Sequence, residues 1–222
     1  MVNHHLEQMA QALINEKFSD ENYTHSYVFD ELTTQIKPGT NYQPKRVEQG
    51  IPFLNIRNIR NNDIDLQDVK YITPAEYERV HKQWKPEKND ILISRIGTLG
   101  LVARIDKSDL PIAVHYNFIN IKAGKLPHYV LYFLLQSDYF QEKYHLIKKQ
   151  SVQEYVTIDD VKLITIASVD SIDSMDFTAY KSLFSKIMIL QEESKSLVSL
   201  RDSLLPKLMS GELSVADIQA VK

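Results

Sequence analysis

The sequence predicts an α+β fold, in which a mostly β domain with short helices is joined to one long C-terminal helix. In the middle of the chain, short β-rich runs such as "DILISRI" and "NFINIKA" alternate with turn-forming clusters such as "KPGTNYQP". Near the C-terminus the apolar residues instead recur at heptad spacing, the pattern of a long helix. A chain of 222 residues, 43% hydrophobic and 25% charged, is long enough to bury its own core.

The first segment, residues 1–20, is predicted to contain a short amphipathic helix from His4 to about Lys17. Its apolar side chains recur every three or four residues, so they share one face of a helix. That face needs a partner inside the molecule. It is formed by Leu6, Met9, Ala10, Leu13 and Ile14.

The second segment, residues 21–175, is predicted to be the globular body. Runs such as "IPFLNI" and "LVARI" are typical of half-buried or buried strands. Between them, "PHYVLYFLLQSDYFQEKYHLIKKQ" has its aromatic residues at helical spacing, which predicts two short helices with a break near Ser137 and Asp138.

The third segment, residues 176–222, is predicted to form the long helix. No Gly or Pro interrupts Phe177 to Leu205, a stretch that would reach roughly 40 Å as one helix. With Tyr180 as the first a position, most a and d positions are apolar or aromatic, while Ser194 and Arg201 are polar. The apolar seam consists of Tyr180, Leu183, Ile187, Leu190, Leu197, Leu204 and Leu208.

The end of this helix is predicted from "PKLMSG". Pro206 has no amide hydrogen for the helical ladder and disfavours helix at Leu205, so we expect a kink or an end there. Gly211 can then adopt the left-handed conformation that closes a helix.

Two arrangements could cover the apolar seam. The helix could fold back along the body as an ordinary core helix, or it could form a coiled coil with the N-terminal helix, with a second chain, or with both. The narrow seam favours the coiled coil. Because the N-terminal helix covers less than half of the length, we expect a second chain as well, in a homodimer held by the seam from Tyr180 to Leu208.

Composition and motifs exclude several kinds of site. The absence of cysteine excludes disulfides, thiolate metal ligands and a thiol nucleophile. Asp63, Asp65 and Asp68 alternate, but they lack the glycine and terminal glutamate of a calcium loop, so a solvated turn is expected. There is no Gly-rich phosphate loop or nuclease signature. We therefore expect no catalytic residue, metal or cofactor in this chain.

The sequence also indicates a cytoplasmic protein. No apolar run approaches the roughly 18 residues that a membrane-spanning helix needs, and the N-terminus lacks the layout of a signal peptide. The net charge of −3 exerts no general attraction on nucleic acid. A DNA-binding function would therefore require local clusters of cations.

Such clusters occur in four stretches, where cations suited to phosphates stand beside amides suited to base edges. In "FLNIRNIRNND", strand alternation would place Leu54, Ile56 and Asn58 on one face and Asn55 and Arg57 on the other. For each stretch, a plain solvated loop or polar strand face is the alternative. The candidate DNA-binding residues are Gln43, Lys45, Arg46, Asn55, Arg57, Asn58, Arg60, Ser94, Arg95, Lys148, Lys149, Gln150, Ser151 and Gln153. By contrast, the stretch from His115 to Asn117 precedes a half-buried strand and is expected to have a packing or turn role.

Four stretches together resemble a known family. They are "GIPFLNIRNI", "NDILISRIGTLG", "SVQEYVTIDDVKLITI" and the C-terminal "LVSLRDSLLPKLMSGEL". In this order they resemble the specificity (S) subunit of type I restriction-modification enzymes, and the resemblance covers nearly the whole chain. Family members typically carry two target-recognition domains and two conserved helices, whereas this chain has one of each. It resembles either a natural half-length subunit or the C-terminal half of a longer one.

The resemblance implies a non-catalytic subunit of an ATP-dependent restriction and methylation complex. Its recognition domain would read one half of a bipartite site in double-stranded DNA, and its helices would dock the methyltransferase (M) subunits. Restriction (R) subunits would complete the complex, and S-adenosylmethionine, ATP and Mg would be bound by those partners. The alternative from the residues alone is a helical protein-interaction adaptor that binds no nucleic acid.

Overall fold

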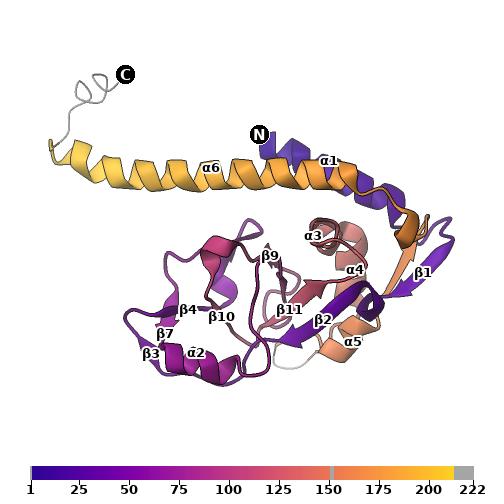
Figure 1. The fold of residues 1–222 in the computed structure, drawn as a ribbon, viewed down its shortest axis with the longest axis horizontal. Helices are drawn as coiled ribbons and strands as arrows, with labels where there is room; N and C mark the ends of the chain where they lie inside the picture. Colours follow the sequence, from indigo (N-terminus) through magenta and orange to yellow (C-terminus); the bar gives the residue numbers. More distant parts are fainter. Residues whose placement is uncertain (1, 151–152, 213–222) are drawn as a thin grey trace.

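The computed structural model describes residues 2–150 and 153–212 and confirms the predicted α+β fold. A β-rich body lies beneath two helices, α1 (Val2–Lys17) and α6 (Thr178–Met209), which run side by side in Figure 1. The distal half of α6 continues past α1. None of the helices in the described ranges is long and apolar enough to cross a membrane.

The predicted N-terminal helix is confirmed, with one change in its buried face. Ala10, Ile14 and Phe18 are buried, and their spacing of four residues defines the stripe that packs into the molecule. Met9 was expected on this face, but its side chain is 55% exposed because it lies to one side of that stripe.

The main sheet is antiparallel, with the strand order β2 (Thr33–Pro38), β11 (Phe118–Ala123), β8 (Ile91–Ser94) and β9 (Val102–Arg104). Ile121 of β11 is paired with Ile36 on one side and with Ile91 on the other, and all three are buried. The predicted strands in "DILISRI", "LVARI" and "NFINIKA" are therefore neighbours in one sheet.

A second sheet has the order β10 (Ala113–Val114), β4 (Ile51–Leu54), β7 (Lys70–Ile72) and β3 (Arg46–Val47), with β10 parallel to β4. Helix α2 (Pro74–Val80) follows β7, and Thr73 caps it by accepting a hydrogen bond from the Glu76 amide. Two further strand pairs are β1 (His25–Val28) with β12 (Thr165–Ser168) and β5 (Ile59–Arg60) with β6 (Asp63–Ile64). Short helical elements are α5 (Ile158–Lys162) and 3-10 turns at Phe29–Leu32, Lys107–Asp109 and Ile172–Ser174.

The predicted break between two short helices is confirmed. Helices α3 (His128–Gln136) and α4 (Asp138–Leu146) meet at Ser137. The hydroxyl of Ser137 donates to the Leu134 carbonyl and accepts from the Phe140 amide, so one buried side chain ends α3 and caps α4.

The expected strand alternation from Leu54 to Asn58 is wrong. Strand β4 ends at Leu54, and Ile56–Asn58 forms a 3-10 turn. Side-chain hydrogen bonds replace the ladder bonds there: Asn55 Oδ1 accepts from the Ile56 amide at 2.8 Å, and Asn58 Oδ1 accepts from the Asn55 amide at 3.0 Å.

The proximal half of α6 is covered by its own chain. Tyr180, Phe184 and Ile187 are buried among residues of α1 and α3, and the Tyr180 hydroxyl donates to the Leu13 carbonyl at 2.8 Å. Tyr180 and Ile187 are therefore not available to a second chain, which corrects the expected interface at those positions. The division of the chain into three segments stays a prediction. In the structure, α1 and α6 share one hydrophobic core with the body.

Of the two outcomes expected at Pro206, a kink or an end of the helix, the end is wrong. The helix runs through Pro206 to Met209, and Gly211 (φ +75°) adopts the predicted left-handed conformation just beyond it. Pro206 removes one amide donor, but the surrounding residues are exposed, and the ladder resumes with the Ser210 amide donating to the Pro206 carbonyl at 2.9 Å.

Candidate nucleic-acid interface

The turn from His115 to Asn117 is the centre around which the loops away from α6 are arranged. The Arg95 amide donates to the Asn117 carbonyl at 2.7 Å, and the Tyr116 amide donates to the Thr40 carbonyl at 2.9 Å. The segments that follow β8 and β2 are thereby fixed beside one turn. We call this surface, made by residues 37–46, 79–84, 95–98, 115–117, 148–150 and 153–156, the loop face. Figure 1 shows α2 at the edge of the body away from α6.

The loop from Lys148 to Val156 joins this face through Arg95. The Arg95 Nε atom donates to the Val156 carbonyl at 3.0 Å, and the Val156 amide donates back to the Arg95 carbonyl at 2.9 Å. Lys149 and Tyr155 exchange backbone hydrogen bonds, which closes the loop. These bonds bring the paired residues Lys149 and Tyr155 close to Arg95, while Ser151 lies outside the described residues.

Two of these lysines already have carboxylate partners. Lys148 contacts Glu154 at 2.8 Å, and Lys149 contacts Asp160 at 2.7 Å. The hydrogen bond that Lys149 donates to Asp160 raises the pKa of Lys149, and the same bond lowers the pKa of Asp160. Lys149 keeps its charge at neutral pH, and the ion pairs of both lysines reduce the attraction that they offer to a phosphate.

A cleft of about 770 Å³ on the loop face brings several positive side chains together. Among the described residues that line it are four cations and no carboxylate. Within the described part of the chain, Lys37, Lys82 and Arg95 form no ion pair with an acidic side chain. We call it the basic cleft; its lining is Lys37, Pro38, Gly39, Thr40, Asn41, Arg79, Val80, Lys82, Gln83, Trp84, Arg95 and Tyr116.

Arg79, at the edge of the basic cleft, is held in place by an aromatic ring. Its guanidinium lies 4.2 Å from the centre of the Tyr42 ring, and Nη1 donates to the Tyr42 hydroxyl at 2.8 Å. Glu76 is the nearest acid, at 3.9 Å. The geometry leaves further N–H groups of Arg79 available to a ligand.

Sequence reasoning found Arg95 but missed most of the basic cleft. Lys37, Arg79 and Lys82 come from three separate stretches, and only the fold brings them together. The available signal was "HKQWK", where lysines flank a tryptophan in the manner of a nucleic-acid-binding segment.

Amide side chains lie next to the basic cleft. The Gln43 Nε2 atom is 3.3 Å from His115 Nε2, and Asn117 Nδ2 donates to Asn55 Oδ1 at 3.5 Å. His115 is buried, which confirms its expected packing role, and this burial lowers the pKa of its imidazole, with a smaller effect from the charge of Arg46. The imidazole is therefore neutral at pH 7. Lys45 and Arg46 are exposed on the adjoining strand and loop.

Other candidate residues lie elsewhere or are buried. Arg57 and Arg60 line a separate cleft that also contains Asp65 and Asp68, and Arg60 contacts Asp65 at 3.3 Å. Asn58 is 2% exposed and bonds the backbone, so it cannot reach DNA in this conformation.

Ser94 is also corrected as a DNA contact. It is fully buried, and its hydroxyl donates to the Thr98 carbonyl at 2.6 Å and accepts from the Leu101 amide at 2.8 Å. These bonds shape the glycine-containing turn after β8, so Ser94 supports the position of Arg95.

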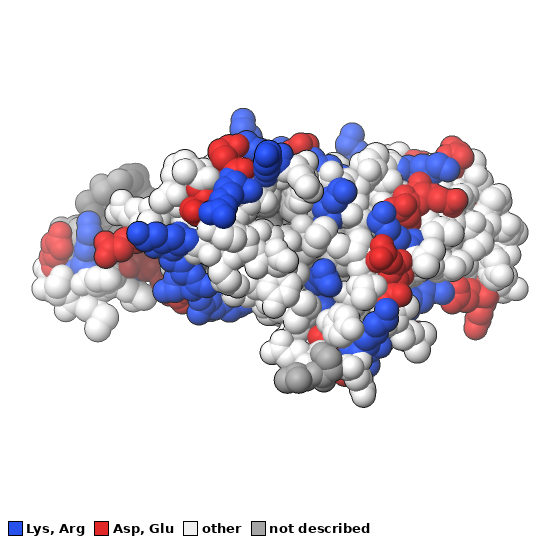
Figure 2. Space-filling view, turned by 90° about the horizontal axis from the view of Figure 1, so that it is seen from below, with Lys and Arg blue, Asp and Glu red and all other residues white. Residues whose placement is uncertain are grey.

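Charge on the side away from α6 is distributed in separate groups. Figure 2 shows Lys and Arg side chains over much of this face, several of them next to Asp or Glu. Attraction to a polyanion therefore depends on local sites such as the basic cleft. Within the described residues, no three His, Asp or Glu side chains are placed to hold a metal ion.

Comparisons with known proteins agree on one family. The family model described as "Type I restriction modification DNA specificity domain" matches residues 31–171, more than half of the chain. The EcoKI type I restriction enzyme specificity subunit of Escherichia coli K12 is 21% identical over 141 residues, which are 60% of this chain and 30% of that protein.

Two solved structures share the fold. The HsdS subunit from Thermoanaerobacter tengcongensis has a TM-score of 0.55 at 13% identity, covering 96% of this chain and 52% of its own. The type I restriction-modification S subunit from M. genitalium also has a TM-score of 0.55, at 17% identity, covering 90% and 49%. The chain thus spans about half the length of these solved relatives.

Proposed function

This chain belongs to the family of type I restriction-modification DNA specificity domains, and from this premise we propose that its loop face reads one half of a bipartite site in double-stranded DNA. The observation that carries the proposal is the basic cleft, where Lys37, Lys82 and Arg95 carry charge without an acidic partner beside amide side chains. The cations suit phosphates, and the amides suit base edges.

Within this proposal the parts of the loop face have different roles. Lys37, Arg79, Lys82 and Arg95 bind the DNA backbone and fix the register of the protein on the duplex. Gln43 and Asn55, held next to the turn at His115, present amides to the bases. Loss of a phosphate contact should weaken binding to all sequences, whereas loss of a base contact should relax specificity.

The distal half of α6 supports a further part of the proposal, a homodimer. Beyond the part of α6 that is packed in its own core, Leu197 is 64% exposed and Leu200 is 53% exposed. A repeated apolar stripe on an exposed helix is typical of a surface that another helix covers. Two copies joined there would hold two loop faces at a fixed separation, as a bipartite site requires.

The chemical steps would be carried out by partner subunits. In this proposal the helices dock methyltransferase subunits, restriction subunits join them, and S-adenosylmethionine, ATP and Mg are bound outside this chain. This chain supplies the position on DNA and no reacting group.

The test is DNA binding by the chain assembled with its methyltransferase subunit. We expect anisotropy titrations with a duplex that contains the recognised motif to give an affinity that falls steeply as salt rises, because phosphate contacts release counterions. Modified motifs in the methylome of the source strain would identify that duplex. Absent or salt-insensitive binding would instead support the helical adaptor that binds no nucleic acid.

A further inference from the structure

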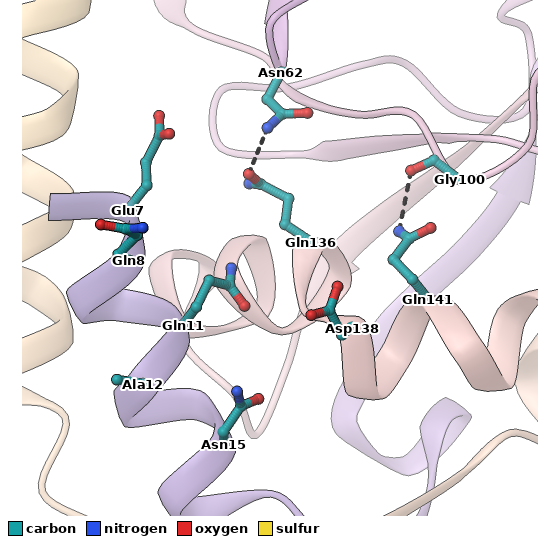
Figure 3. Close-up of a pocket in the computed structure, with 10 residues that line it drawn as sticks. All are labelled: Glu7, Gln8, Gln11, Ala12, Asn15, Asn62, Gly100, Gln136, Asp138 and Gln141. Atoms are coloured by element: carbon teal, nitrogen blue, oxygen red, sulfur yellow. Dashed lines mark hydrogen bonds between the residues drawn. The ribbon is translucent and has the colours of Figure 1, made fainter. Parts of the chain in front are cut away.

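A second cleft, of about 590 Å³, lies between α1, the corner of α3 and α4, and the turn after β5. Figure 3 shows that its lining side chains come from these elements and face a common space. Most of them carry amide or carboxylate groups, and none of the described lining residues is a lysine or arginine. We call it the amide cleft; its lining is Glu7, Gln8, Gln11, Ala12, Asn15, Asn62, Gly100, Gln136, Asp138 and Gln141.

Hydrogen bonds to the backbone fix the orientation of two of these amides. Gln141 Nε2 donates to the carbonyls of Gly100 at 3.0 Å and Leu135 at 2.6 Å, and Gln11 Nε2 donates to the Phe133 carbonyl at 3.3 Å. A carbonyl can only accept a hydrogen bond, so each amide must turn its nitrogen towards it. The oxygens of Gln11 and Gln141 therefore remain without a donor in the described part of the chain.

Asn62 is oriented in the same way through a second amide. Gln136 Nε2 donates to the Tyr132 carbonyl at 3.1 Å, so Gln136 Oε1 must be the atom that accepts from Asn62 Nδ2 at 2.8 Å. Figure 3 shows this contact and the one between Gln141 and Gly100. Asn62 thus adds a third amide oxygen that has no donor among the described residues.

The acids of the amide cleft increase this excess of acceptors. Glu7 and Asp138 form no ion pair with any described cation. Three amide oxygens and two carboxylates therefore face a common space, to which Gln8 and Asn15 add amide groups that can donate as well as accept. The two carboxylates have no cation beside them in the lining, so the cleft favours a ligand that brings N–H groups and positive charge and disfavours the phosphates of DNA.

We propose that the amide cleft is a docking site for an arginine side chain of a protein partner. A guanidinium has five donors in one plane and keeps its charge at any physiological pH, so it can serve several fixed oxygens together. The cleft is open and much larger than a single ion, which suits a side chain that enters from a second protein. The partner that we expect is the methyltransferase subunit, and in this respect the inference rests on the proposed function.

The first experiment reverses charge inside and outside the amide cleft. Asp138→Lys should raise the dissociation constant of the full chain for the purified methyltransferase subunit at least about tenfold, because it places a cation where a guanidinium would bind. Glu142→Lys is the matched control, since Glu142 is an exposed acid on the same helix outside the cleft. Equal affinities for the two variants, at equal thermal stability, would overturn the proposal.

The second experiment remains informative if the charge reversal damages the fold. The chain has no cysteine, so Ala12→Cys introduces a single thiol at the cleft, and Ala75→Cys introduces one on exposed α2. The methyltransferase subunit should slow maleimide labelling at position 12 at least about tenfold and leave position 75 nearly unchanged. Unchanged labelling at position 12, or protection by arginine amide but not by the subunit, would reject a docking site for this partner.

DNA binding separates this inference from the proposed function. If the assembled complex binds duplex DNA while Asp138→Lys leaves assembly intact, only the docking proposal fails. If the unmodified complex assembles through the cleft but binds no DNA at low salt, the DNA-reading proposal fails and the docking site stands.

Discussion

At the scale of single residues, His81 shows how burial decides a protonation state. Its imidazole is 1% exposed, and its Nε2 accepts from the Val114 amide at 3.3 Å, so Nδ1 carries the proton that is donated to the Trp84 carbonyl at 3.2 Å. This neutral ring cannot take a second proton without losing the Val114 bond. Burial lowers the pKa of His81 to about 4.

This shift predicts a pH-dependent stability. Below a pH of about 6.5 the unfolded chain binds a proton at His81 that the folded chain does not bind until about pH 4, so the free energy of unfolding falls as the pH decreases through this window. We expect His81→Gln to remove up to about 3 kcal/mol of the difference in unfolding free energy between pH 4.5 and 7.5 in urea titrations. His145→Gln, at an exposed histidine, should leave that difference nearly unchanged. Similar pH dependence in both variants would contradict the assignment to His81.

Lys82 gives the corresponding prediction for DNA. It lies in the basic cleft without an acidic partner among the described residues. Lys82→Ala should weaken binding similarly for all duplex sequences and reduce the slope of log K against log salt by about 1, since one phosphate contact is lost. Lys107→Ala removes an exposed lysine outside the cleft and should leave the slope unchanged. An unchanged slope for Lys82→Ala would remove this residue from the interface.

At the scale of elements, Phe184 attaches α6 to the body. Its ring contacts the rings of His128, Tyr132 and Phe133 from α3, and the Arg104 guanidinium lies 5.4 Å from its centre. Phe184→Ala should cost about 3–5 kcal/mol of unfolding free energy, measured by denaturant titration, because it opens a cavity between two helices. Ser185→Ala, next to it on the exposed side, should change stability by under about 0.5 kcal/mol.

The elements also show what the sequence alone could predict. Heptad and strand patterns give the long helix, the N-terminal helix and the main strands, because those patterns record which faces are apolar. They do not give the partner of each face, so the burial of Tyr180 and Ile187 against α1 and α3 could not be predicted. The turn at Ile56–Asn58 was missed because side-chain caps decide it, and strand periodicity does not record them.

The basic cleft shows the same limit of sequence-based prediction for residues that lie far apart along the chain. Arg95 and the lysines near residue 148 form recognisable local clusters, and the structure places them together. Lys37, Arg79 and Lys82 become neighbours only when β2, α2 and the loop after β8 are arranged in space. Local sequence statistics therefore miss a site whose charge is assembled from segments far apart along the chain.

At the scale of the whole molecule, the two halves of α6 have different surroundings. The proximal half of α6 is fixed to the body, and at its middle Lys195 contacts Asp63 of β6 at 2.8 Å, which ties the helix to the β5–β6 pair. The distal half carries Leu197 and Leu200, whose side chains are exposed. Because one continuous helix joins both halves, a partner bound to the distal half acquires a defined position relative to the loop face.

We therefore expect the exposed leucines in the distal half of α6, Leu197 and Leu200, to control the oligomeric state. Leu197→Asp combined with Leu200→Asp should convert a dimer into a monomer, since each carboxylate would be buried without a partner at the interface while remaining solvated in the single chain. Light scattering at several concentrations measures the mass directly. Ser196→Asp with Ser203→Asp adds the same charge at exposed polar positions and should remain dimeric. If the leucine variant stayed dimeric, the second copy would have to bind elsewhere, and α6 would not set the distance between two loop faces.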